Sequence, residues 1–247
     1  MCLIVFAWKL FSPAPLFVAA NRDEFYARPT EAAHRWKDSP SVFAGRDLQH
    51  GGTWMGVSQT HDGLSGGRFA AITNFRDPQR TRQSAPTRGK LVSDFLESDI
   101  SPQEYIEKIR APSRQFNGFN LLVGDCSTLI WFSNYGEAHP RNGQPLSPGI
   151  YGLSNALLDN PWHKVVRARA QFASLLAQHA PADAYFEMLS DTAPAPDALL
   201  PNTGVGLQWE RILSPMCVVS PQYGTRASTL VQLRTDEPPV LNERLVR

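Results

Sequence analysis

The chain has 247 residues, of which 42% are hydrophobic and 19% charged, a composition ordinary for a globular protein of one domain or two small ones. Its formal net charge of +1 gives no reason to expect nucleic acid or an anionic membrane as a partner. Its three cysteines, Cys2, Cys126 and Cys217, lack CxxC spacing, which argues against a disulfide framework or a structural zinc site.

The first twenty residues resemble a signal peptide only superficially. They lack a positively charged beginning, Lys9 interrupts the apolar run, and Pro13 and Pro15 lie where an apolar core would continue. No apolar run in the chain reaches the length of about eighteen residues that a membrane span requires. We therefore expect a cytoplasmic protein without stable insertion into a membrane.

The chain opens with a predicted β-hairpin. Residues 2–8 are a continuous apolar run, residues 12–15 break it with two prolines, and residues 16–20 form a second apolar run. A turn centred near residue 12 or 13 places Cys2 opposite Asp23, within about two residues, in an antiparallel pair. The first thiol of the chain should therefore lie beside a polar segment of four residues, Asn21, Arg22, Asp23 and Glu24.

A second hairpin is predicted from residues 53–58 and 69–74. The turn-rich segment 62–67 joins the two runs. This pairing would bring Asn74 near Trp54 at one end of a sheet.

The remaining pattern alternates helices and strands. The predicted helices cover residues 87–96, 102–109, 161–178 and 182–189, and the predicted strands cover residues 120–124, 129–133 and 150–154. After a loop at 193–206, residues 215–220 and 227–233 are expected to pair as the closing strands. This order of elements indicates an α+β fold in which helices cover the faces of the sheets.

Cys2 is the main candidate for a reactive residue. Removal of the initiator methionine, which is normal before a residue as small as cysteine, would leave a thiol and a free α-amine on one residue. An α-amine has a pKa of about 8, so it can accept the thiol proton near neutral pH. The alternative is a buried, unreactive cysteine at the start of a strand.

The polar segment after the second apolar run strengthens this interpretation. Four consecutive polar residues are out of place within a buried sheet, but at the end of a strand they can project into a cleft. An arginine beside the thiol favours the thiolate, and a carboxylate beside the α-ammonium group can orient it. The alternative is an exposed turn that contains a charge pair.

Six short motifs extend this pattern along nearly the whole chain. They are MCLI at 1–4, ANRDE at 20–24, GGTWMG at 51–56, TNFR at 73–76, GLSN at 152–155 and GTRAST at 224–229. In this order they resemble the NRDE family, which includes transport and Golgi organisation proteins. That family in turn resembles the cysteine branch of the N-terminal-nucleophile (Ntn) hydrolases, such as choloylglycine hydrolases and penicillin V acylases.

The resemblance implies a single domain over residues 1–247 with a four-layer αββα fold of antiparallel sheets. It also implies catalytic roles, with Cys2 as the nucleophile, Arg22 as its charge partner, Asp23 holding the α-amine, Asn74 and Asn155 at an oxyanion site, and Arg226 steadying the nucleophile. The hydrolases separate the arginine and the aspartate by two residues, whereas the two are adjacent here. Glu24 is therefore an alternative to Asp23 as the acidic partner.

Asn21, Glu24 and Trp54 are the candidate substrate-binding residues. A core position is the alternative for Trp54, because a tryptophan packs in a core more often than it forms a ligand platform. The six histidines lack metal-ligand spacing, so a metal site is not expected. We also expect no cofactor.

Two classes of function follow from the resemblance. As a hydrolase or acyltransferase-like enzyme, the protein would use the Cys2 thiolate to attack a small non-peptide amide or thioester and form an acyl-enzyme. As a binding or trafficking protein, it would hold a hydrophobic ligand, such as haem, an acyl-coenzyme A or a lipid, in the same cleft. A small-molecule ligand or substrate is expected in both cases, and the oligomeric state is left open.

Overall fold

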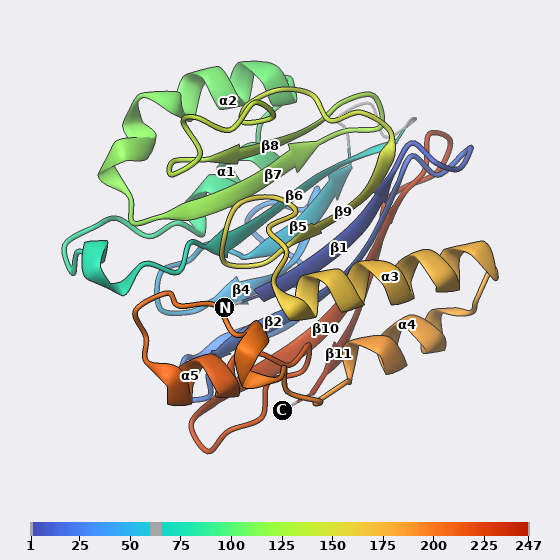
Figure 1. The fold of residues 1–247 in the computed structure, drawn as a ribbon. Coiled ribbons are helices and arrows are strands. Elements are labelled where there is room, and N and C mark those ends of the chain that lie inside the picture. The colour runs from blue at the N-terminus through green and yellow to red at the C-terminus, as the bar shows by residue number, and fades with distance from the viewer. Residues whose placement is uncertain (1, 60–65, 247) are drawn as a thin grey trace.

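The computed structural model describes residues 2–59 and 66–246, which form eleven β-strands and five α-helices (Figure 1). A five-stranded antiparallel sheet has the order β11-β10-β2-β1-β9, with β1 (Cys2–Trp8), β2 (Leu16–Phe25), β9 (Gly149–Leu153), β10 (Tyr223–Leu233) and β11 (Val240–Leu245). A six-stranded antiparallel sheet has the order β3-β4-β5-β6-β7-β8, with β3 (Thr30–Arg35), β4 (Val42–Asp47), β5 (Met55–Gln59), β6 (Gly67–Asn74), β7 (Phe119–Gly124) and β8 (Leu129–Ser133). The helices are α1 (Lys90–Leu96), α2 (Pro102–Arg110), α3 (His163–Ala177), α4 (Ala182–Leu189) and α5 (Leu207–Ile212).

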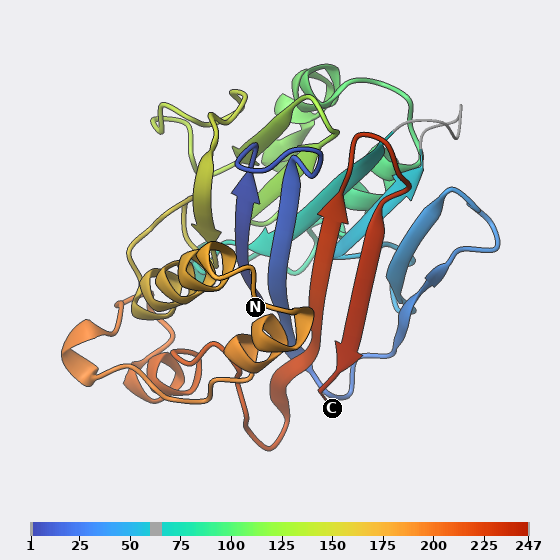
Figure 2. The same cartoon turned by 90° about the vertical axis from the view of Figure 1, so that its right-hand side faces the viewer.

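The predicted opening hairpin is confirmed. Strands β1 and β2 pair antiparallel with Cys2 opposite Arg22, one residue from the predicted partner. Strand β9 lies along the other edge of β1, and β10 lies along the other edge of β2 (Figure 2). From Ile4 onward β1 is therefore enclosed by strands on both sides, whereas Cys2 pairs only with β2 and lies beyond the end of β9.

The apolar side chains of β1 divide between the two faces of its sheet, as the two-residue period of a strand requires. Ile4, Phe6 and Trp8 pack against side chains of β5, β6, β7 and β8 between the two sheets. Leu3 and Val5 pack on the other face, against α3 and α4. Cys2 lies two residues before Ile4, so its side chain projects from the same face of β1 and points toward the six-stranded sheet.

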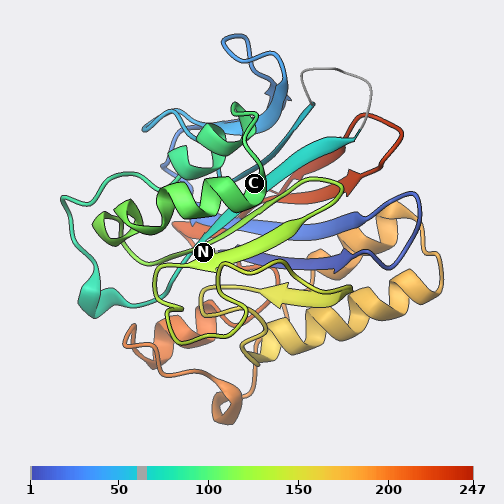
Figure 3. The same ribbon diagram turned by 90° about the horizontal axis from the view of Figure 1, so that it is seen from above.

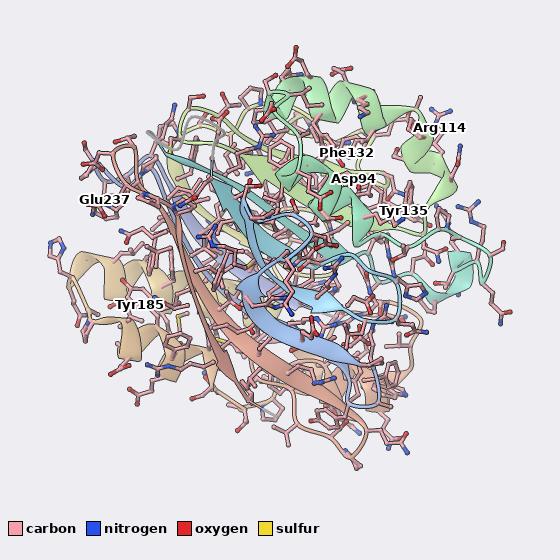
Figure 4. The ribbon with its side chains drawn as sticks, turned by 180° about the vertical axis from the view of Figure 1, so that it is seen from behind. Asp94, Arg114, Phe132, Tyr135, Tyr185 and Glu237 are labelled. Atoms are coloured by element: carbon pink, nitrogen blue, oxygen red, sulfur yellow. The ribbon has the colours of Figure 1, made fainter. Side chains whose placement is uncertain are left out.

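A further cluster lies on the outer face of the six-stranded sheet. There Ile72 and Leu121 pack against Phe95 of α1 and Ile106 of α2. Figure 3 shows α1 and α2 on one side of the sheets and α3 and α4 on the other. Phe132 and Tyr185, which Figure 4 labels on opposite sides of the molecule, belong to the two outer clusters.

The α+β fold class is confirmed, and most predicted elements are present. The helix predicted at 87–96 begins only at Lys90, because Gly89 lies against Gly52 and accepts a hydrogen bond from the main chain of Thr53 (3.3 Å). A Cβ atom on Gly52 would lie only 2.4 Å from the Gly89 carbonyl carbon. The predicted turn at 62–67 falls mostly outside the described residues.

The closing strand pair is a wrong prediction. Residues 215–220 form no strand apart from one bridge, between Val219 and Gly224, and β10 pairs instead with β2 and β11. The sequence patterns also do not predict β3, β4, β11 and α5. Strands β3 and β11 are edge strands that carry several charged residues, so they lack the apolar alternation by which a strand is recognised. None of the helices within 2–59 and 66–246 is long and apolar enough to cross a membrane.

Candidate active site

Cys2 lies in a cleft of about 400 Å³ at the end of the space between the two sheets. The first strand contributes Cys2, and the end of β2 contributes Arg22, Asp23 and Glu24. Trp54, the residue before β5, and Asn74, the last residue of β6, also line the cleft. The structure thus places six of the predicted site residues around one cleft, although they come from four separate segments of the chain.

The main chain of Cys2 is held by the segment that follows β9. The Cys2 nitrogen donates a hydrogen bond to Asn155 Oδ1 (3.4 Å), and the Cys2 carbonyl accepts one from Ser154 Oγ (2.9 Å). Asn155 Nδ2 donates to the carbonyl oxygen of Asn74 (2.8 Å). Asn155 therefore joins the start of β1 to the end of β6, and its amide oxygen, rather than its NH₂ group, faces Cys2.

The thiol itself is strongly buried, since only 7% of Cys2 is exposed. Burial raises the pKa of this thiol; the nearby Asp23 carboxylate also raises it, and the Arg22 guanidinium lowers it. We expected a thiol whose pKa is depressed by its arginine neighbour. The arginine acts in the expected direction, but desolvation of the thiolate is the larger effect.

Ion pairs line the opening of the cleft. Glu24 lies 3.9 Å from the guanidinium groups of both Arg22 and Arg28, and Arg28 in turn pairs with Asp47 of β4 at 2.7 Å. Arg88 also lines the cleft and donates to the carbonyl oxygen of Gly118 (3.0 Å). Glu24 thus lies between two arginines at the surface of the cleft.

The side chain of Asp23 projects from the opposite face of β2 to those of Arg22 and Glu24, because successive residues of a strand alternate between its two faces. Only 1% of it is exposed, and its Oδ1 accepts a hydrogen bond from Thr225 Oγ1 (2.7 Å). Burial raises the pKa of the Asp23 carboxyl, whereas the positive charge of Lys164 lowers it. This carboxylate therefore depends on nearby cations and hydrogen bonds to hold its charge.

Sequence reasoning missed Lys164, at the start of α3. Only 3% of it is exposed, and its Nζ donates to the carbonyl oxygen of Leu213 (3.0 Å). Burial lowers its pKa to about 8, although the negative charge of Asp23 opposes this. A signal was present, because Lys164 falls on the same helical stripe as the buried Ala168, Phe172 and Leu176.

We predict that Lys164 makes the stability of the protein rise with pH between about 8 and about 10.5. In this window the unfolded chain keeps the lysine proton and the folded protein has lost it, so the unfolded state binds more protons. The free energy of unfolding should then increase by about 2–3 kcal/mol relative to a Lys164→Met variant. Urea denaturation of both proteins at the two ends of this range measures the change; a constant difference would contradict the prediction.

Two other predicted residues have their side chains directed elsewhere. Asn21 Nδ2 donates to the carbonyl oxygens of Leu189 (2.8 Å) and Met216 (2.9 Å), on the face covered by α4. Arg226 lies at a β-bulge in β10, and its guanidinium donates to the carbonyl oxygens of Phe25 (3.1 Å), Tyr26 (3.3 Å) and Arg28 (3.1 Å). It holds the turn that follows β2, and it lines a neighbouring pocket that it shares with Arg22.

Replacing Arg226 with alanine should therefore affect stability more than thiol chemistry. Loss of charged donors to three turn carbonyls should lower the free energy of unfolding by about 1–2 kcal/mol. An Arg114→Ala control removes only an exposed ion pair with Glu137 and should change little. Alkylation of Cys2 by iodoacetamide should be nearly unchanged in Arg226→Ala but slower in Arg22→Ala. A slowing equal to that of Arg22→Ala would instead place Arg226 at the nucleophile.

The fold and the site define an α+β protein of two antiparallel sheets, with a buried cysteine at the head of its first strand and a polar cleft in front of it. The chain matches the Transport and Golgi organisation 2 family over residues 1–246 and belongs to that family. This confirms the resemblance to the NRDE family.

Curated relatives carry the same name. A Transport and Golgi organization protein 2 homolog from Bos taurus is 36% identical over 99% of this chain and 92% of its own length. The Homo sapiens homolog is 35% identical over the same shares of both chains. Transport and Golgi organization protein 2 of Drosophila melanogaster is 28% identical over 72% of this chain and 66% of its own.

Proposed function

We propose that the protein is an Ntn-type cysteine hydrolase or acyltransferase-like enzyme that acts on a small non-peptide amide or thioester, with Cys2 as its nucleophile. The observation that carries the proposal is the buried polar environment of Cys2, whose nitrogen donates to Asn155 Oδ1 (3.4 Å) and whose thiol interacts electrostatically with the buried Asp23 and Lys164. A cysteine that served only to fill a core would not need buried charged groups around it. The α-amine of an N-terminal cysteine would need such groups to orient its charge.

The packing of the layers supports the same proposal. Helices α1 and α2 cover the outer face of one sheet, α3 and α4 cover the outer face of the other, and the sheets pack on each other. This succession agrees with the αββα arrangement that the resemblance to Ntn hydrolases implies. All three cysteines are free thiols, which suits the proposed cytoplasmic location.

The raised pKa of the Cys2 thiol gives the α-amine a defined role. Because the thiol does not ionise readily by itself, a base must take its proton, and after removal of Met1 the α-amine is the nearest one. The sulfur then attacks the carbonyl carbon, and the C–N or C–S bond breaks as the leaving amine or thiol takes the proton from the α-ammonium group. Water, activated by the same amine, cleaves the thioester of the acyl-enzyme.

Three measurements test this proposal. Intact mass of the protein from its native host should show that Met1 is absent; predominantly Met1-retained protein would contradict the α-amine mechanism. Acyl thioesters of N-acetylcysteamine should be turned over by the wild type and by Cys217→Ala, but not by Cys2→Ala. Low-dose iodoacetamide should label Cys2 before Cys126 and Cys217. Faster labelling of either of these two would show that the nucleophile has been misassigned.

The alternative function is passive binding of a hydrophobic ligand such as haem, an acyl-coenzyme A or a lipid. The cleft beside Cys2 is lined by four arginines, Arg22, Arg28, Arg82 and Arg88, together with Glu24 and Asp47. These charges do not suit a wholly apolar lipid, whereas arginines can pair with the propionates of haem or the phosphates of an acyl-coenzyme A, so turnover decides between the two functions. If Cys2 reacts fastest but no amide or thioester is turned over, the binding function should replace the catalytic one.

A further inference from the structure

Four residues form a row across the five-stranded sheet, from the proposed nucleophile to the outer edge. Cys2 pairs with Arg22, Arg22 with Ala227, and Ala227 with Leu245 of the edge strand β11. Directly paired residues project from the same face of a sheet, so all four side chains point toward the six-stranded sheet. Figure 2 shows β1, β2, β10 and β11 side by side in this order.

A side pocket of about 230 Å³ lies along this row. Arg22, Ala227 and Leu245 form one wall, and Ala32 of β3 and Trp54 lie on the other. The side pocket shares four lining residues with the cleft beside Cys2, namely Arg22, Asp47, Thr53 and Trp54. The two spaces are therefore neighbours, and the side chains of Arg22 and Trp54 lie between them.

Charged residues also line the side pocket, but they have partners within the protein. Arg46 pairs with Asp38 (2.6 Å), and Asp47 pairs with Arg28 (2.7 Å). Glu243 accepts a hydrogen bond from the main-chain nitrogen of Ala33 (2.7 Å). Arg226 is bonded to the turn carbonyls described above.

The apolar groups of the pocket are available to a ligand. They are the indole of Trp54 and the side chains of Ala32, Ala227 and Leu245, and Leu245 is 69% exposed at the outer end. Although charged residues stand around the side pocket, the surface that it exposes is mostly apolar, whereas the surface of the cleft beside Cys2 is mostly polar. The side pocket therefore suits hydrocarbon better than the cleft does.

We propose that the side pocket holds an unbranched hydrocarbon tail of the substrate whose carbonyl carbon Cys2 attacks. The inference rests on the proposed function for the identity of the reacting carbonyl, but the pocket itself does not depend on catalysis. An apolar cavity of about 150 Å³ holds a benzene molecule, so a space of this size accommodates roughly nine carbon atoms. The row of paired residues directs the tail from Cys2, past Arg22, toward Leu245.

Alkylation of Cys2 tests the pocket without requiring turnover. N-octyl-iodoacetamide should label Cys2 at least about tenfold faster than iodoacetamide at low concentration, because its chain is buried before the thiol reacts. Ala32→Phe, at an exposed position on an edge strand, should fill the pocket and remove this preference while leaving the rate with iodoacetamide unchanged. Leu245→Asp should also reduce the preference. Ala138→Phe, at an exposed turn outside the pocket, is the matched control.

Equal labelling by the two reagents in the wild type, or an undiminished preference in Ala32→Phe and Leu245→Asp, would overturn the proposal. Acetyl and octanoyl thioesters of N-acetylcysteamine distinguish it from the proposed function. A chain-length preference in alkylation without turnover of either thioester would support the pocket and contradict the enzyme. Turnover at equal kcat/KM for both thioesters would support the enzyme and contradict the pocket.

Discussion

Replacing Glu210 with alanine should lower the free energy of unfolding by about 3–5 kcal/mol, because a buried guanidinium would lose its carboxylate. The side chains of Arg76 and Glu210 are only 5% and 3% exposed and lie 2.6 Å apart. Burial lowers the pKa of Arg76, and the negative charge of Glu210 opposes this shift. The Arg76 guanidinium also stacks over the ring of Trp162, at 4.5 Å from its centre.

Urea denaturation of a small set of variants measures this effect. Glu107→Ala is the matched control, because Glu107 pairs with Arg110 at 3.0 Å on an exposed face of α2, where such pairs contribute about 0–1 kcal/mol. The double variant Arg76→Met with Glu210→Leu should recover much of the lost stability, since it leaves no buried charge unpaired. A Glu210→Ala variant as stable as Glu107→Ala would show that water reaches Arg76.

The Arg76–Glu210 pair also bears on the site. The main-chain nitrogen of Arg76 donates to the carbonyl oxygen of Asn155 (2.7 Å), the residue whose side chain holds the Cys2 nitrogen. Glu210 in turn accepts hydrogen bonds from the main-chain nitrogen (2.8 Å) and hydroxyl (2.6 Å) of Thr203. Loss of the pair should therefore disturb the position of Asn155 as well as the stability of the protein.

The sequence predicts those parts of the fold that depend on local patterns. The apolar runs on either side of a proline-rich turn determine the register of β1 and β2, and α4 has the predicted bounds, Ala182–Leu189. The edge strands β3 and β11 are not predicted, since their polar residues form strands only because neighbouring strands offer partners. The partner of β10 depends in the same way on where β2 lies.

In the candidate site, too, local sequence patterns predict some of the contacts and not others. Cys2 and Arg22 are brought together by a hairpin within the first 25 residues, which periodicity can detect. The buried pair of Arg76 and Glu210 joins residues 134 positions apart, and no local pattern relates them. The hairpin register predicts that residues 21–24 lie beside Cys2, but the depth of burial that raises the pKa of its thiol appears only with the packed structure.

The choice between Asp23 and Glu24 as the acidic partner, which the sequence leaves open, can be decided by two matched substitutions. We expect Asp23→Asn to reduce kcat/KM for a thioester at least about 100-fold, because the α-amine that Asp23 would hold is the proposed base, and a positioned base contributes about that much or more. Glu24→Gln should reduce it far less. Asp23 is buried beside Lys164 and bonded to Thr225, whereas Glu24 lies at the cleft surface between two arginines.

Each substitution replaces a carboxylate by an amide of the same shape, so differences in packing are small. In Asp23→Asn the Thr225 hydroxyl can still donate to the side-chain amide oxygen, and thermal denaturation should confirm that both variants are folded. Intact mass should show that both have lost Met1, which separates an effect on catalysis from an effect on processing. If Asp23 holds the α-amine, only Asp23→Asn should shift the pH at which alkylation of Cys2 is half-maximal. A larger loss of kcat/KM in Glu24→Gln than in Asp23→Asn would assign the role of acidic partner to Glu24. The α-amine would then have to face the cleft rather than the buried Asp23 and Lys164 on the other face of the sheet.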